Sequence, residues 1–284
     1  MESSHLFEEF VTPARPAAGY IGGKRRLARP LTRAIDRIEH QTYAEAFVGM
    51  GGVFLRRSRR PAAEVINDWS EDIATFFRIL QRHYVAFLDM LRFQITTRSG
   101  FERLQRVDPS TQTDLERAAR FLYLQRLAFG GKVTARSFGI SHGDPGGLDV
   151  TKLAPLLEQI HERLAGVIIE RLPWADFLAR YDRPETLCYL DPPYYGSEGD
   201  YGRELFDRAQ FPIMAEVLGG LNGRFLLSLN DHPDVRSIFD RFAMVRVDLL
   251  YSITQGDAVP ASELIISNLP AEQLNRIVPS ATGR

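Results

Sequence analysis

The chain has little of what a disulfide-linked, membrane-spanning or metal-dependent protein needs. Cys188 is its only cysteine, so no internal disulfide can form, and a reducing, cytoplasmic setting is expected. No apolar run approaches the length of about 18 residues that a transmembrane helix requires, so we expect no membrane contact. The six histidines are scattered without the spacing of metal ligands, and no metal site is expected.

Residues 1–18 lack the basic start and the apolar centre of a secretory signal peptide. They carry three acidic side chains, and we interpret them as a flexible N-terminal tail, with a second tail at 271–284. The length between these tails suits one large domain with an insertion. The hydrophobic content of the whole chain, 44%, is ample for a packed core.

The net charge of −1 conceals an uneven distribution of basic residues. Residues 24–60 hold ten Lys and Arg against three Asp and Glu, and residues 92–136 hold nine against four. This segregation indicates a basic face, which would allow a nearly neutral protein to contact phosphates. The alternative is that these arginines only decorate solvent-exposed helix faces.

Two stretches that contain glycine suit the close approach of a ligand. Residues 20–24 (Tyr-Ile-Gly-Gly-Lys) precede an expected helix at 25–40, an arrangement typical of an anion-binding loop. An expected strand at 42–47 leads into residues 49–52 (Gly-Met-Gly-Gly) and an expected short helix at 53–60, which lets the backbone approach a nucleotide-like ligand. The first stretch could equally be a simple flexible turn, and it lacks the spacing of a P-loop. The second could equally begin a Rossmann domain, although its spacing is not that of the dinucleotide fingerprint.

An expected second strand at 63–66 ends in Asn67 and Asp68. An acidic residue at the end of a second strand, about 20 residues beyond the glycines, is where a ribose would be held. A helix cap is the alternative role for Asp68, although Ser70 is the better candidate for that cap.

Strand and helix patterns alternate along most of the chain. Further strands are expected at 167–170, 186–189 and 225–229, with a helix at 210–221 and a closing antiparallel pair at 245–250 and 264–267. This alternation predicts an α/β fold with a largely parallel sheet.

The stretch 71–165 is mainly helical in pattern and interrupts this alternation. It contains a capping box from Thr113 to Glu116. Its loop 130–136 is small, flexible and basic, and it could enter the groove of a nucleic acid or simply cross over between helices.

Residues 191–194 (Asp-Pro-Pro-Tyr) are the most distinctive stretch, and they follow the apolar strand at 186–189. Proline fixes its own φ and pushes the preceding residue towards extended geometry, so this stretch is a stiff arm. It aims a carboxylate, a free carbonyl and an aromatic ring at one point. Those groups suit an exocyclic amine on a flat heterocycle, although a rigid turn is the alternative.

These stretches, in this order, resemble the Dam-type adenine-specific DNA methyltransferases, which use S-adenosylmethionine. The resemblance spans about residues 19–268 and rests on 20–24, 45–54, 66–68, 176–177 and 191–194. It implies a Rossmann-like methyltransferase sheet, mostly parallel, built from residues 19–70 and 166–270. Residues 71–165 would then be a mainly helical target-recognition insert.

The resemblance also implies a role for each matched residue. Lys24 would pair with the carboxylate of the cofactor, Asp68 with its ribose hydroxyls and Asp176 with the amino group of its adenine. The full set of cofactor-binding residues would be Tyr20, Lys24, Phe47, Gly49, Gly51, Asp68, Asp176 and Phe177.

At the target, Asp191 and the Pro192 carbonyl would grip the amine while Tyr194 stacks on the extruded base. Arg126, Lys132 and Arg136 would contact the nucleic acid. The loop at 130–139 lacks much of the recognition pattern of the family, so the target sequence stays open.

The expected activity is site-specific N6 methylation of adenine in double-stranded DNA, by a monomer that could have a companion restriction endonuclease. The same acidic-Pro-Pro-aromatic chemistry could instead methylate adenine in RNA or an amide in a protein. A catalytically idle nucleic-acid-binding module and a dinucleotide oxidoreductase are the alternatives from other classes.

Overall fold

A computed structural model describes residues 9–24, 27–139, 147–201, 206–251 and 259–278. Within these residues seven strands form the main sheet, in the order β5-β4-β2-β6-β7-β9-β8. The first five run parallel, and β9 lies antiparallel to both β7 and β8. The predicted α/β fold, with its mostly parallel sheet and closing antiparallel pair, is confirmed.

The strands of this sheet are β2 (Thr42–Glu45), β4 (Ala63–Asn67), β5 (Ile168–Glu170), β6 (Thr186–Leu190), β7 (Arg224–Asn230), β8 (Ala243–Tyr251) and β9 (Val259–Ser267). A separate pair joins β1 (Glu9–Phe10) to β3 (Arg59–Arg60). The α-helices are α1 (Ala28–Ile35), α2 (Glu71–Arg82), α3 (Tyr84–Arg92), α4 (Arg98–Arg106), α5 (Asp114–Leu127), α6 (Val150–Arg163), α7 (Trp174–Tyr181), α8 (Gln210–Gly219), α9 (Pro233–Ile238) and α10 (Ala271–Ile277). Short 3₁₀ turns are η1 (Phe54–Arg56), η2 (Pro109–Thr111), η3 (Phe129–Gly131) and η4 (Glu198–Tyr201). None of the described helices is long and apolar enough to cross a membrane.

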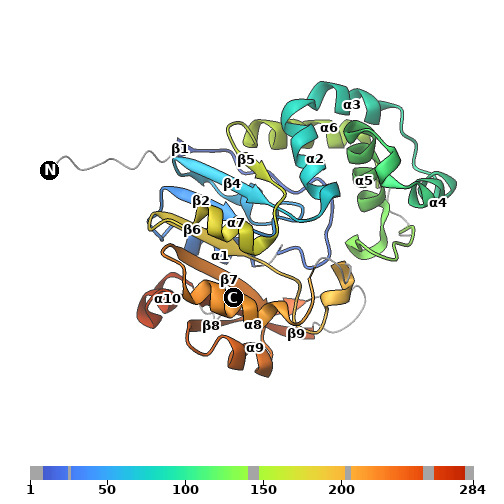
Figure 1. Cartoon of the computed structure of the whole chain (residues 1–284). Coiled ribbons are helices and arrows are strands. Elements are labelled where there is room, and N and C mark those ends of the chain that lie inside the picture. Colours follow the sequence, from blue (N-terminus) through green and yellow to red (C-terminus); the bar gives the residue numbers. More distant parts are fainter. Residues whose placement is uncertain (1–8, 25–26, 140–146, 202–205, 252–258, 279–284) are drawn as a thin grey trace.

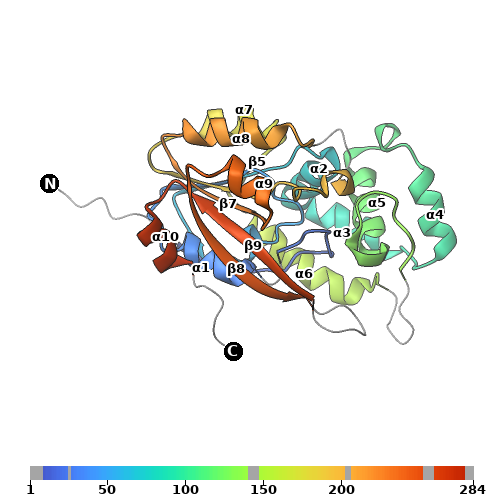
Figure 2. The ribbon, with the colours of Figure 1, turned by 90° about the horizontal axis from the view of Figure 1, so that it is seen from below.

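Helices cover both faces of the sheet (Figure 2). On β6, Leu187 and Tyr189 belong to the hydrophobic cluster under α1 and α10, whereas Cys188 and Leu190 belong to the cluster under α7, α8 and α9. Successive side chains of a strand point to opposite faces, so a strand in mid-sheet must be apolar on both. This is why β6 reads as an uninterrupted apolar run.

The helical stretch 71–165, the insert, packs against the rest of the chain and shares its hydrophobic core (Figure 1). Phe76 of α2, Phe87 of α3 and Phe121 of α5 lie in the same hydrophobic cluster as Leu31 of α1. Full burial of such a side chain contributes about 1.5–3 kcal/mol. The predicted helical character of 71–165 and the capping box that begins α5 are confirmed.

The two expected tails are partly built into the fold. At the N-terminal end, β1 pairs with β3, and Ala14 and Ala17 are buried. At the C-terminal end, residues 271–277 form α10, whose Leu274 and Ile277 are buried. The sequence did not reveal these two ordered segments, because a few alanines and one short amphipathic helix give a signal too weak to distinguish from that of a tail. Residues 1–8 and 279–284 of the expected tails lie outside the described residues.

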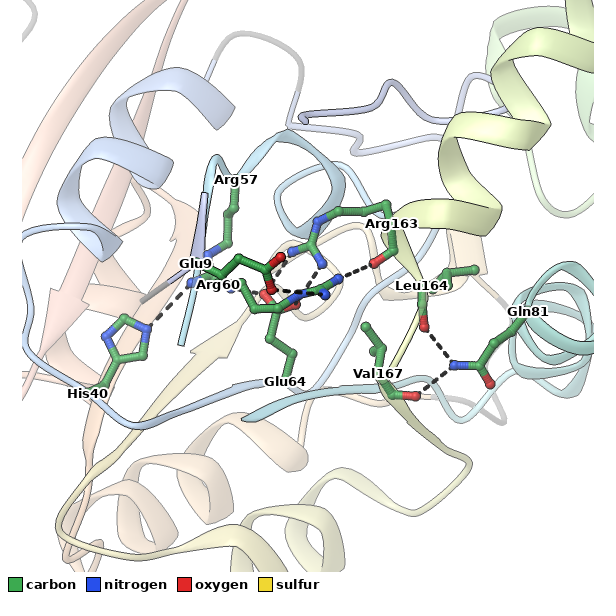
Figure 3. A network of polar contacts seen from close by, with 9 residues as sticks. All are labelled: Glu9, His40, Arg57, Arg60, Glu64, Gln81, Arg163, Leu164 and Val167. Carbon is green, nitrogen blue, oxygen red and sulfur yellow. Dashed lines mark hydrogen bonds and ion pairs between the residues drawn. The ribbon is translucent and has the colours of Figure 1, made fainter. Parts of the chain in front are cut away.

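The helix expected at 53–60 is only the short turn η1, because the chain becomes extended at Arg57. This change of backbone direction places the fully buried Arg57 side chain against Glu64 of β4. Nη1 of Arg57 and Oε1 of Glu64 are 2.7 Å apart. Arg163, at the end of α6, donates two further hydrogen bonds to Glu64, of 2.6 and 2.7 Å. Figure 3 shows this network, which joins the sheet, the segment after the glycine loop and the end of the insert.

Candidate active site

A cavity of about 480 Å³ opens at the carboxyl ends of the parallel strands. This edge is where open α/β sheets bind their ligands. The walls come from the 15–24 segment, from the end of β2 with its glycine loop, and from the residues that follow β4 and β6. The cavity brings together seven of the predicted site residues: Tyr20, Lys24, Phe47, Gly49, Asp68, Arg126 and Asp191.

The glycine loop that follows β2 depends on glycine at two positions. Gly49 and Gly51 have φ values of +51° and +76°, which disfavour any residue with a Cβ. A Cβ at Gly51 would also lie 2.8 Å from the Cγ of Leu55. At Gly49 it would lie 3.3 Å from the ring of Tyr20, so the two glycine stretches of the sequence pack against each other.

Asp68 anchors this loop from the end of β4. Its two carboxylate oxygens accept hydrogen bonds from the backbone N–H groups of Gly49 and Ser70, each 2.9 Å long. Burial raises the pKa of Asp68 to about 6, although these two N–H groups oppose the shift. Ser70 takes the predicted N-cap position of α2, but its side chain makes no capping hydrogen bond.

Asn67 fixes the strand ends below the cavity. Its Nδ2 donates to the carbonyls of Ala46 and Leu172, at 2.9 and 3.1 Å, and its Oδ1 accepts from the N–H of Leu172 at 2.8 Å. The amide therefore ties the ends of β2, β4 and the segment after β5 together, which explains why an Asn stands beside Asp68.

Lys24 lies in a buried cluster with the Asp-Pro-Pro-Tyr arm, and its relative exposure is 4%. Its Nζ is 2.9 Å from Oδ1 of Asp191 and 3.1 Å from Oε2 of Glu263 on β9. It also donates to the hydroxyl of Tyr194. The resemblance assigned Lys24 to the carboxylate of the cofactor, whereas here its charge is directed to the Asp-Pro-Pro-Tyr arm.

Asp191 sits directly after β6 with a side-chain exposure of 18%. Burial raises its pKa to about 6, even though the nearby ammonium group of Lys24 favours the ionised form. The hydroxyl of Ser228 on β7 donates to Oδ1 of Asp191 at 2.9 Å. Pro192 and Pro193 are buried, so the arm is held as well as stiff.

Sequence reasoning missed Glu45, Glu263 and Ser228. Glu45 lines the cavity, is 2% exposed and accepts a 2.6 Å hydrogen bond from Tyr43; burial raises its pKa to about 8. The usable signal was an ionisable residue inside an apolar strand, which holds for Glu45 and Glu263. Ser228 carries no comparable signal.

A second cavity, of about 250 Å³, adjoins the first and shares Phe47, Trp69 and Phe206 with it. Two predicted cofactor residues on α7 lie outside the linings of both cavities. Asp176 is exposed in the first turn of α7, and Phe177 is fully buried in the core beneath it. Their assignment to the cofactor stays a prediction.

The three predicted nucleic-acid contacts differ in their surroundings. Arg126 donates to the carbonyls of Gly147 and Ala17, at 2.6 Å each, so it ties the insert to the 15–24 segment. Arg136 is half-buried and donates to Oε1 of Gln125 at 3.2 Å. Lys132 is exposed in the loop after α5.

A Rossmann-like sheet with a glycine loop, an acidic residue after β4 and an Asp-Pro-Pro-Tyr arm after β6 defines an amino-group methyltransferase. Comparison with known families specifies the class further. Residues 20–253 match the D12 class N6 adenine-specific DNA methyltransferases, and the chain belongs to this family.

Individual relatives are distant. The type II methyltransferase M.CviBI of Paramecium bursaria Chlorella virus NC1A is 20% identical over 263 residues, which is 89% of this chain and 99% of the viral protein. The type II methyltransferase M1.LlaDCHI of Lactococcus lactis subsp. cremoris is 26% identical over 207 residues, covering 67% of this chain and 69% of its own length. The DNA N-6-adenine-methyltransferase of Escherichia phage P1 is 30% identical over 153 residues, half of this chain and 20% of the phage protein.

Proposed function

We propose that this chain transfers a methyl group from S-adenosylmethionine to N6 of an adenine extruded from double-stranded DNA. The observation that supports it most directly is the Asp191 carboxylate, fixed at the cavity by Lys24 and Ser228. We further propose that the chain acts as a monomer and that it has a companion restriction endonuclease, since two of its relatives are named type II methyltransferases.

The cavity has the features that S-adenosylmethionine needs. Asp68 and Asp191 line it together with basic side chains such as Arg15 and Arg56, and a lining of both signs suits a ligand that carries a carboxylate as well as cationic groups. The glycine loop leaves its surface free of side chains at Gly49, and Asp68 keeps lone pairs for ribose hydroxyls beside its two backbone bonds. When bound, this cofactor supplies a methyl group carried on a positively charged sulfur.

The residues of the arm act on the target amine. The N6 lone pair of adenine is delocalised into the ring, so the amine is a poor nucleophile. Lys24 and Ser228 both bond Oδ1 of Asp191, which leaves Oδ2 to accept one N6 hydrogen, and the Pro192 carbonyl can accept the other. Holding both hydrogens localises the lone pair on nitrogen and orients it towards the methyl carbon.

Proton transfer completes the reaction. An N6 atom that has accepted the methyl group carries one proton too many and must lose it. Asp191 is the group placed to take that proton, and burial raises its pKa to about 6, which makes it a better base than an exposed carboxylate. Tyr194 would stack on the extruded base, and the exposed Lys132 would contact a phosphate.

Modified bases in the DNA of an expression host provide the test of this function. Expression in a host free of DNA methylation should introduce N6-methyladenine at one recurring sequence, because the enzyme acts on extruded adenine in duplex DNA. Direct sequencing of the host DNA maps the modification, and cells that express the Asp191→Asn variant are the control. Unmodified DNA, with methyl groups found in RNA instead, would contradict the DNA assignment.

The cofactor assignment predicts a specific defect in the Asp68→Asn variant. Loss of a charged acceptor should weaken S-adenosylmethionine binding on the order of 10- to 100-fold, since a hydrogen bond to a charged group is worth about 1.5–3 kcal/mol. Titration calorimetry measures the change. The matched control is Asp182→Asn, because Asp182 also accepts two backbone N–H groups, from Asn222 and Gly223, but lies outside the cavity lining. Equal cofactor affinity in the two variants would refute the role of Asp68.

A further inference from the structure

Two polar side chains at the end of β7 contact the catalytic arm from the neighbouring strand. Ser228 and Asn230 are two residues apart and therefore lie on the same face of β7. The parallel register pairs Leu190 of β6 with Leu227 of β7, so the next residues, Asp191 and Ser228, are level with each other. The strand pairing itself brings the serine to the carboxylate.

Ser228 connects Asp191 to the core of the sheet. It is fully buried, its Oγ is 2.9 Å from Oδ1 of Asp191, and the hydroxyl of Tyr189 lies 2.8 Å away. A serine hydroxyl has one proton to donate. When Ser228 donates that proton in a hydrogen bond to Asp191, Tyr189 must donate to Ser228. This fixes the direction of the short chain of hydrogen bonds, and the carboxylate cannot rotate without breaking it.

Asn230 holds the other end of the arm. Its Oδ1 accepts from the backbone N–H of Tyr195 at 2.9 Å, and its Nδ2 donates to the carbonyl of the same residue at 3.0 Å. Tyr195 directly follows Tyr194, the ring that would stack on the base. Two hydrogen bonds to one backbone unit fix both its position and its orientation.

We propose that Ser228 and Asn230 are positioning residues: Ser228 fixes the orientation of the Asp191 carboxylate, and Asn230 fixes the course of the chain beyond Tyr194. The proposal rests on the proposed function and deepens it. Neither residue is among those that line the cavity. Their effect is on the geometry in which the amine is held, and a misplacement of about 1 Å can cost on the order of 100-fold in rate.

The pH dependence of the reaction distinguishes an effect of Ser228 on the Asp191 carboxylate from a merely structural role in core packing. The Asp191 carboxylate faces Lys24 from the N-terminal segment, Glu263 from β9 and Glu45 from β2, besides the hydroxyl of Ser228. The Ser228 hydrogen bond favours the ionised form, so its loss should raise the pKa of Asp191 further. Because the ionised form grips the amine, the acid limb of the rate profile should move to higher pH.

Steady-state methyl transfer to duplex DNA, measured against pH, tests the proposal. Ser228→Ala should lower kcat by about 10- to 100-fold, leave the KM for S-adenosylmethionine within about threefold, and move the acid limb to higher pH. Asn230→Ala should lower kcat without moving that limb. The matched control is Ser267→Ala, which removes another fully buried hydroxyl, bonded to the Phe225 carbonyl at 2.6 Å, with no contact to Asp191.

A second pair of variants keeps the test valid if Ser228→Ala folds poorly. Ser228→Thr and Ser228→Val introduce side chains of nearly equal volume, and only threonine keeps the hydroxyl. Higher kcat and a lower-pH acid limb for threonine would support the positioning role. The positioning role of Ser228 would be wrong if the threonine and valine variants had equal pH–rate profiles, or if the profile of Ser228→Ala matched that of Ser267→Ala. Either result would leave the proposed function intact, provided that the wild-type chain is active. Absence of transfer by the wild-type chain would overturn the proposed function and this role together.

Discussion

Replacement of Asp191 with asparagine is expected to slow methyl transfer on the order of 10²- to 10³-fold or more, while S-adenosylmethionine still binds. The amide keeps the size of the carboxylate and one oxygen that can accept from Ser228 and Lys24. It replaces the second acceptor with a donor, so a hydrogen of the target amine meets a hydrogen of the side chain. Lys24 keeps the carboxylate of Glu263 as a second partner. Transfer of labelled methyl to DNA measures the rate, and a parallel calorimetric titration measures cofactor binding.

The matched control for this variant is Asp231→Asn. Asp231 directly follows β7, the strand beside β6, and its side-chain exposure of 14% is close to the 18% of Asp191. Its carboxylate pairs with Arg236 and does not line the cavity. Near wild-type transfer by Asp191→Asn, or an equal loss in Asp231→Asn, would contradict the assigned chemistry.

Most of the sheet could be predicted because its signals are local. The apolar run at 186–189 and the alternation at 245–250 each reveal a strand without knowledge of its neighbours, and β6 and β8 lie there. Turns and buried charges are less predictable. The helix expected at 53–60 ends early because Arg57 turns inward to Glu64, and no pattern within that stretch shows that its arginine is buried.

The residues of the site likewise differ in how far the sequence predicts them. The carboxylates of Asp68 and Asp191 could be located from the sequence, because each directly follows a strand whose carboxyl end faces the cavity. The partners of Lys24 could not. Asp191 is distant in the chain, and Glu263 enters from β9, which packs beside β7 only after the antiparallel pair closes the sheet. A motif shows which residues take part, but the pairing of its charges depends on strand order.

The buried network behind the sheet predicts the largest effect on stability. Glu64→Ala should lower the free energy of unfolding by about 3–5 kcal/mol, because it leaves two buried guanidinium groups without a counter-charge. The side chains of Glu64, Arg57 and Arg163 are each 1% exposed. A loss of this size is a large part of the total stability of about 5–15 kcal/mol that is typical of a folded protein. Urea unfolding followed by the fluorescence of the two tryptophans measures it.

The surface end of the same network supplies the control. Glu9 is 72% exposed and lies 3.8 Å from Arg60, so Glu9→Ala should cost less than about 1 kcal/mol. A third variant tests the cause: combining Glu64→Leu with Arg57→Met and Arg163→Met removes all three fully buried charges. It should be more stable than Glu64→Ala, since only Arg60, which is 21% exposed and keeps Glu9 nearby, loses Glu64 as a partner. Methionine can also keep part of the packing that the two guanidinium groups make on Tyr43 and Phe54. The explanation by unpaired buried charge would be wrong if Glu64→Ala were as stable as Glu9→Ala. It would also be wrong if the triple variant were less stable than Glu64→Ala.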